Sequence, residues 1–103
     1  MHATLRRIKT RPGEAAEVAR LIEDQYLPQI EHLEGFVSYT LVDLGEDEIS
    51  SVGVFTDQEG ADRANAAARD WTAAVLAPYV ASPLEARAGV VLVDHRHPVE
   101  AAP

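Results

Sequence analysis

The chain has 103 residues and a formal net charge of −8, from 9 lysines and arginines against 17 aspartates and glutamates. Its length suits a single domain, and its negative charge argues against a nucleic-acid partner, because phosphates demand a positive surface. No apolar run approaches the roughly 20 residues that span a bilayer, and the start lacks the apolar stretch of a signal peptide, so we expect a cytoplasmic protein without a membrane partner.

Residues 1–35 predict a strand followed by a broken helix. Residues 3–10 mix basic residues with Leu, Ile and Thr, which indicates a first strand. Apolar residues then recur at helical spacing from Ala15 to Leu33, which predicts a long helix. We expect Pro28 to kink this helix or to restart it as a short second piece, and Gly35 to end it.

A hairpin and a second helix are expected next. Residues 36–44 and 48–56 are rich in β-branched and aromatic residues and flank a short polar turn, which predicts two hairpin-connected strands. Asp57 is a suitable N-cap for a second, alanine-rich helix. The apolar face of this helix is expected to consist of Ala61, Ala64, Ala68, Trp71 and Val75.

The end of the chain predicts one more strand. Pro78 and Pro83 are expected to bracket an irregular segment. Residues 84–95, with the apolar run 90–93, are expected to form the last strand. We take residues 1–97 as the single domain and expect residues 98–103 to form a frayed tail, because chain ends are rarely held in place.

The element order βαββαβ predicts an α+β, ferredoxin-like fold: an antiparallel four-stranded sheet with two helices on one face. Adjacent strand residues point to opposite faces, yet apolar neighbours such as Leu41 with Val42 and Val54 with Phe55 occur in these strands. Both sheet faces are therefore apolar, and the helices cover one of them. A second copy of the sheet is the simplest cover, which predicts a homodimer built as an α/β barrel. Local irregularity of the strands is the alternative.

The chain resembles the dimeric α/β-barrel proteins typified by the antibiotic-biosynthesis monooxygenase domain, over residues 3–96. The resemblance rests on the element order, on an alanine-rich second helix containing Asn65 and Trp71, and on the segments Arg11-Pro12-Gly13, Gly35-Phe36-Val37 and Val54-Phe55-Thr56-Asp57. It implies a cavity between the sheet and the helices. It also implies an activity found in the family, oxidation of polycyclic phenols without a metal or flavin, so no cofactor is expected. This fold carries many functions, so the likeness specifies chemistry weakly.

Members that oxidise aromatic polyketides use an Asn, a Trp, a Tyr and an Arg near the cavity, which here match Asn65, Trp71, Tyr79 and Arg87 in order. The resemblance implies that Asn65 and Arg87 stabilise a phenol oxyanion, that Trp71 stacks on the substrate ring, and that Tyr79 relays a proton. Each residue has a structural alternative. Trp71 suits a core position, Asn65 a solvent-exposed one and Tyr79 a packing role at a helix end, and Arg87 suits an exposed strand end or an ion pair between subunits.

Two further groups of residues have competing interpretations. Arg6, Arg7, Lys9 and Arg11 crowd the first strand, and we favour a solvated strand end over a cation that points into a pocket and holds an anionic substrate. His2, His95 and His97 are expected at the same end of the sheet, where a frayed terminus is favoured over a metal site. Heme-degrading members of the family need a histidine on or after the second helix as the iron ligand. No histidine lies between His32 and His95, so we do not expect heme degradation.

Three functions follow from the sequence. The first is a cofactor-independent monooxygenase acting on a small aromatic or polyketide-like substrate. The second is a non-catalytic small-molecule-binding or stress-related dimer, which the lack of a convincing general base supports. The third is an isomerase-like activity, which requires a histidine or aspartate in the cavity; Asp43 and Asp94 are the available acids, and both are expected at strand ends.

Overall fold

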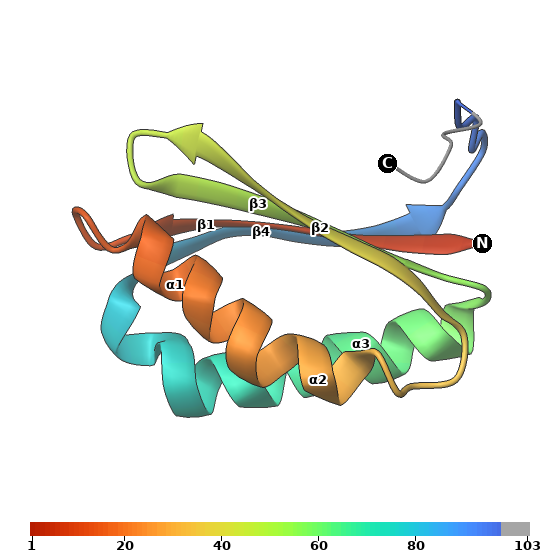
Figure 1. Ribbon diagram of the computed structural model, residues 1–103, viewed down its shortest axis with the longest axis horizontal. Helices are drawn as coiled ribbons and strands as arrows, with labels where there is room; N and C mark the ends of the chain where they lie inside the picture. Colours follow the sequence, from red (N-terminus) through yellow and green to blue (C-terminus); the bar gives the residue numbers. More distant parts are fainter. Residues whose placement is uncertain (98–103) are drawn as a thin grey trace, which may run out of the picture.

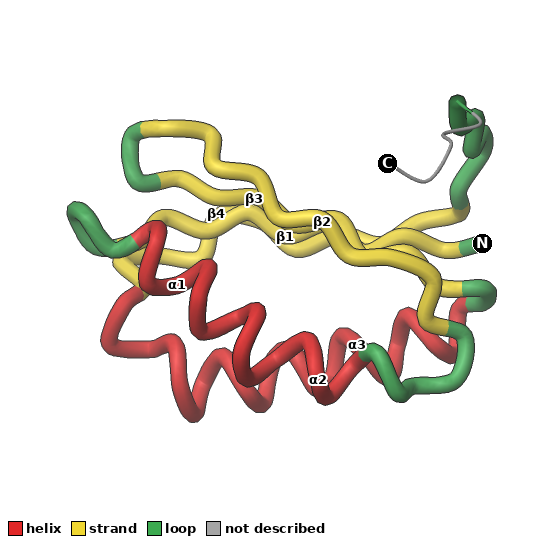
Figure 2. Tube along the Cα trace, viewed as in Figure 1, coloured by secondary structure: helices red, strands yellow, loops and turns green. Residues whose placement is uncertain are grey.

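A single antiparallel sheet with the strand order β2-β3-β1-β4 forms one layer of the computed structural model, which is described here over residues 1–97. The strands are β1 (His2–Thr10), β2 (Phe36–Gly45), β3 (Glu48–Phe55) and β4 (Val80–Val90). The helices α1 (Ala15–Leu21), α2 (Leu27–Ile30) and α3 (Gln58–Trp71) lie together on one face of this sheet (Figures 1 and 2). The arrangement confirms the α+β, ferredoxin-like prediction. The expected frayed tail, residues 98–103, lies outside the described residues.

The core lies between the sheet and the helices. Strand β3 shows why: its residues alternate between buried positions that face the helices, from Ile49 to Phe55, and half-buried positions on the other face. The helices contribute the apolar positions that recur along one side of each. The buried apolar side chains are Val18, Leu21, Ile22, Tyr26, Ile30, Ile49, Phe55, Ala61, Ala64, Ala68, Trp71 and Leu76.

Both helical segments contain a π-helical turn. In the first, η1 (Ile22–Tyr26) joins α1 to α2, and the Leu27 N–H donates to the Ile22 carbonyl five residues back. In the second, η2 (Thr72–Leu76) follows α3 and leads into the short 3₁₀ turn η3 (Ala77–Tyr79). A proline follows each π-turn after one residue, at positions 28 and 78. The expected restart of the first helix at Pro28 is therefore confirmed, because α2 begins at Leu27.

Local hydrogen bonds hold the connections. The Asp57 carboxylate caps α3 by accepting from the Gly60 N–H at 2.8 Å. At the tip of the β2–β3 hairpin, Glu46 and Asp47 adopt positive φ angles of 54° and 62°, as a tight hairpin turn requires. Asp47 also accepts from the Thr10 N–H at 2.7 Å. The tip of the hairpin is thereby tied to the end of β1.

Strand β4 differs from the prediction at both ends. It begins at Val80 and includes Pro83, which was expected in an irregular segment, and it ends at Val90. Proline fits here because β4 is an edge strand, and because the pairing with β1 shifts register beside Pro83. The strand ends where its partner ends: His2 pairs with Val90, and the Val91 N–H reaches the Met1 carbonyl at 2.9 Å.

The sheet face opposite the helices carries exposed apolar side chains. Leu5 on β1 is 46% exposed, and Val42 and Leu44 on β2 are 44% and 50% exposed. Half-buried Val52 and Val54 lie beside them on β3. We call the face formed by Leu5, Val42, Leu44, Val52 and Val54 the open face. No helix of the described chain is both long and apolar enough to cross a bilayer.

Candidate functional site

A cavity of about 380 Å³ opens between the sheet and the helices. Its volume falls in the range of small-molecule sites, roughly 300–1,000 Å³. Both π-turns contribute to its wall, through Ile22 and Tyr26 from η1 and through Thr72 and Leu76 from η2. Because π-turns occur frequently at functional sites, this coincidence marks the cavity as the candidate site.

Arg6 brings the cavity a positive charge. It lies on the central strand β1, whose residues Thr4, Arg6 and Ile8 alternate toward the helices, and its half-buried side chain lines the cavity. Its Nη2 donates to the Asn65 Oδ1 at 2.9 Å and to the Asn65 carbonyl at 3.3 Å. Asn65 of α3 therefore holds the guanidinium group of an arginine whose backbone lies in the sheet.

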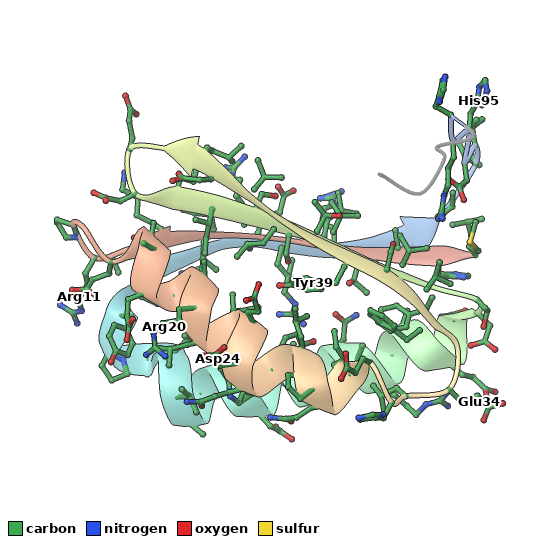
Figure 3. The ribbon with its side chains drawn as sticks, viewed as in Figure 1. Arg11, Arg20, Asp24, Glu34, Tyr39 and His95 are labelled. Atoms are coloured by element: carbon green, nitrogen blue, oxygen red, sulfur yellow. The ribbon has the colours of Figure 1, made fainter. Side chains whose placement is uncertain are left out.

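Aromatic side chains form one wall of the cavity. The Tyr26 ring lies 5.4 Å from the Trp71 ring and 6.0 Å from the Tyr39 ring, centroid to centroid. Tyr39 extends from β2 into the layer between sheet and helices (Figure 3). Such a cluster suits a flat, apolar ligand, because aromatic faces and edges pack well against another ring.

The two tyrosine hydroxyls stay protonated at neutral pH. Burial raises the pKa of Tyr26 to about 12; nearby Tyr39 adds to the rise, and the Arg6 charge opposes it. Burial also raises the pKa of Tyr39, against the opposing effects of a hydrogen bond with Ser51 and of the Arg6 charge. These groups can therefore donate a proton or a hydrogen bond, but they are poor bases.

This burial predicts a loss of stability in alkali. An unfolded tyrosine ionises near pH 10, about two units below Tyr26 in the folded protein. Between those values the folded state binds more protons, so the free energy of unfolding should fall as pH rises from about 10 to 12. We expect Tyr26→Phe to make this fall shallower in urea titrations at successive pH values. Tyr79→Phe removes a hydroxyl outside the cavity wall and serves as control; equal slopes in wild type and Tyr26→Phe would contradict the prediction.

The structure places the four residues implied by the family resemblance differently. Trp71 is buried at 8% exposure and lines the cavity. Asn65 does not line it, but its side chain contacts Arg6, which does. Tyr79 packs against the core, and its carbonyl accepts from the Arg11 N–H at 2.8 Å. Arg87 lies on the open face, because it pairs directly with Leu5 across β1 and β4.

Other cavity residues were missed or left unassigned by the sequence. From the sequence, Tyr26 and Tyr39 suit positions in the core or at a dimer interface, and no pattern singles out Glu85. Arg6 was one of four clustered basic residues, and the structure selects it as the cation that points into a pocket. The alternation of β1 carries this signal, since Arg6 shares a face with Thr4 and Ile8.

No cluster of three or more potential metal ligands is found within residues 1–97. His2 lies at the start of β1, and His95 lies beyond the end of β4 on the side of the sheet away from the helices (Figure 3). The histidines are therefore not part of the cavity wall. Asp43 and Asp94, the acids considered for an isomerase, do not line it either.

Solved structures share this fold. A protein of unknown function from Nitrosomonas europaea gives a TM-score of 0.70 at 19% identity, over 96% of this chain and 95% of that chain. A "putative antibiotic biosynthesis monooxygenase" from Chloroflexus aurantiacus gives 0.66 at 20% identity, over 92% and 96%. One of the same name from Bordetella bronchiseptica gives 0.71 at 15% identity, over 89% and 97%. No family model and no curated protein matches the sequence.

Proposed function

We propose that the protein is a cofactor-independent monooxygenase that oxidises a small aromatic or polyketide-like molecule in the cavity. One observation carries the proposal: an aromatic-walled cavity of about 380 Å³ contains a guanidinium group placed to stabilise an anion. The structures named as antibiotic biosynthesis monooxygenases support it through their common fold. Fold likeness alone does not establish a reaction, so the argument rests on the cavity.

The proposed reaction needs only dioxygen as a second substrate. An anthrone-type phenol first loses a proton, and its ring anion gives two electrons to dioxygen, forming a carbon–oxygen bond. The resulting hydroperoxide loses water, so one oxygen atom stays as a quinone carbonyl and the other leaves as water. In this proposal Arg6 stabilises the anion, Trp71 and Tyr26 hold the rings, and Tyr39 donates a hydrogen bond.

Water is the proposed proton acceptor. Glu85 is the one acidic residue that borders the cavity among the described residues. It pairs directly with Arg7 across β1 and β4, so its side chain shares the open face with Arg87 and is not placed to act as a base in the cavity. Its side chain is 47% exposed, and one carboxylate oxygen lies 3.8 Å from Nη1 of Arg87. We propose that Arg87 pairs with Glu85 on the open face, outside the cavity, and that Tyr79 supports the cavity wall.

Oxygen-dependent turnover tests this function. With anthrone-type phenols in air, we expect quinone formation above the uncatalysed background, together with an equimolar uptake of oxygen. Arg6→Gln should lower the turnover rate by about a hundredfold, a typical loss when a donor that stabilises an oxyanion is removed. Arg7→Gln removes a cation from the neighbouring position on the open face and should leave the rate unchanged. A panel of such phenols with no rate above background would exclude the oxidative function.

A second candidate is a binding or stress-related protein without catalysis. The placement of Glu85 favours it, because a carboxylate on the open face leaves the cavity without a general base. Ligand binding in the cavity without any conversion of the ligand would support this alternative.

We also propose that the protein is a homodimer whose subunits meet through the open face. Five apolar side chains there, Leu5, Val42, Leu44, Val52 and Val54, have no covering element among the described residues. An apolar surface on a twisted sheet is complementary to its own copy about a two-fold axis. Closure of two such sheets gives a barrel with one cavity on the outer side of each sheet.

A further inference from the structure

Arg6 differs from the other arginines of the sheet in its partners. Arg7 pairs with Glu48 at 3.7 Å, and Arg87 pairs with Glu85 at 3.8 Å. Within residues 1–97 no carboxylate forms an ion pair with Arg6; its contacts are the two oxygens of Asn65. Asn65 therefore orients the guanidinium group without neutralising it.

A charge in such a place is costly unless a ligand compensates it. The surrounding wall is largely apolar or aromatic, through Ile8, Ile22, Tyr26 and Trp71, and a poorly solvated cation loses hydration without gaining a counter-charge. Hydrogen bonds to described residues engage Nη2 only. The guanidinium group has further N–H donors in one plane, which match the two oxygens of a carboxylate or a single phenolate oxygen.

We propose that the cavity selects planar anions, aromatic carboxylates or ionised phenols, through Arg6, with Asn65 as a positioning residue. The inference deepens the proposed function, since it names the charge of the ligand that the cavity takes. It does not depend on turnover, because selection is a property of binding. The overall charge of −8 repels anions at a distance, so the selection must come from this local contact.

Matched probes measure this selection. The first pair is 2-naphthoate with the neutral 2-naphthamide, and the second is 2-hydroxy-1,4-naphthoquinone, ionised at neutral pH, with its methyl ether. Isothermal titration calorimetry gives each affinity. Trp71, the single tryptophan of the chain and part of the wall, reports by fluorescence that binding occurs in the cavity. We expect the anion of at least one pair to bind tenfold or more tightly than its neutral partner.

Substitutions assign the selection to Arg6. Arg6→Gln should remove the preference for the anion while the neutral probe still binds. Arg7→Gln makes the same change of charge one residue along the strand, on the other face, and should keep the preference. Far-UV circular dichroism of each variant checks that the fold is retained.

Asn65→Asp tests the positioning role. The new carboxylate would sit about where Oδ1 now lies, 2.9 Å from Arg6 Nη2, and would supply the missing counter-charge. We expect the affinity for the anion to fall roughly tenfold, with little change for the neutral probe. A purely structural role for Asn65 would instead weaken both probes alike.

The outcomes separate this inference from the oxidative function. A preference for either anion that Arg6→Gln abolishes supports the inference, even if no phenol is ever oxidised. Equal affinities for the charged and neutral members of both pairs would overturn it, as would a preference that survives in Arg6→Gln. Quinone formation without any charge preference would leave the proposed function standing and remove the inference.

Discussion

Replacing Phe55 with alanine is expected to lower the free energy of unfolding by about 3–5 kcal/mol, the usual cost of removing a buried aromatic ring. Phe55 is 1% exposed and lies at the end of β3, with its ring 5.9 Å from that of Phe36. Gly60 at the start of α3 approaches it closely, since a Cβ atom on Gly60 would lie 3.4 Å from the Phe55 Cβ. A domain of this size is typically stable by about 5–15 kcal/mol, so the variant should be marginally folded.

Urea unfolding followed by circular dichroism measures this loss. Phe36→Ala removes the same atoms from a half-buried position in contact with Phe55, and it should cost clearly less. The measurement is made at one protein concentration, because association would add to the apparent stability. If Phe55→Ala were no more destabilising than Phe36→Ala, the placement of the core at the β3–α3 junction would be wrong.

Introducing a charge on the open face is expected to separate the proposed dimer. Val52 lies on β3 between Leu5 of β1 and Thr40 of β2, near the middle of that face. Burying an aspartate there against an apolar partner surface would cost several kcal/mol. At about 4 kcal/mol, Val52→Asp should raise the dissociation constant of the dimer roughly a thousandfold.

Sedimentation equilibrium distinguishes a dimer from a monomer of 11.2 kDa. Ala16→Asp adds the same charge at an exposed position on α1 and should leave the mass of the assembly unchanged. Leu5→Lys, at a side chain 46% exposed, provides a second variant with little effect on the core of a subunit. A wild-type protein that sediments as a monomer at micromolar concentration would end the dimer proposal.

Regular periodicity made most of the fold predictable. The helical spacing of apolar residues such as Val18, Ile22 and Tyr26 indicates one buried helix face. The polar turn after residue 44 indicates a hairpin. These signals are local, so they survive without knowledge of tertiary contacts. The order of the elements then restricts the sheet to very few arrangements.

The candidate site was less predictable because it depends on which face each strand residue takes. Arg6 and Arg87 lie on neighbouring strands, yet one lines the cavity and the other lies on the open face. A shift of one residue in register exchanges the faces of a strand. The register between β1 and β4 shifts beside Pro83, and no local pattern in the sequence predicts such a shift.

The limits of β4 were missed for a similar reason. The apolar run from Val90 to Val93 indicates a strand by composition, but pairing requires a partner. The partner strand β1 begins at His2, opposite Val90, so the remaining valines and leucine extend past it. A sequence pattern measures the tendency of a segment to pair, whereas the length of the neighbouring strand decides how much of it does.

The π-turn at η2 has a consequence for insertions and deletions in the gene. Trp71 and Leu76 are both buried although Leu76 lies five positions after Trp71, a step too long for one turn of an ordinary α-helix. Deleting one residue between them would place Leu76 four positions after Trp71, where an ordinary α-helix keeps both side chains on the same face. Inserting one residue would instead turn Leu76 away from the cavity wall, so this stretch should tolerate the loss of one residue better than the gain of one.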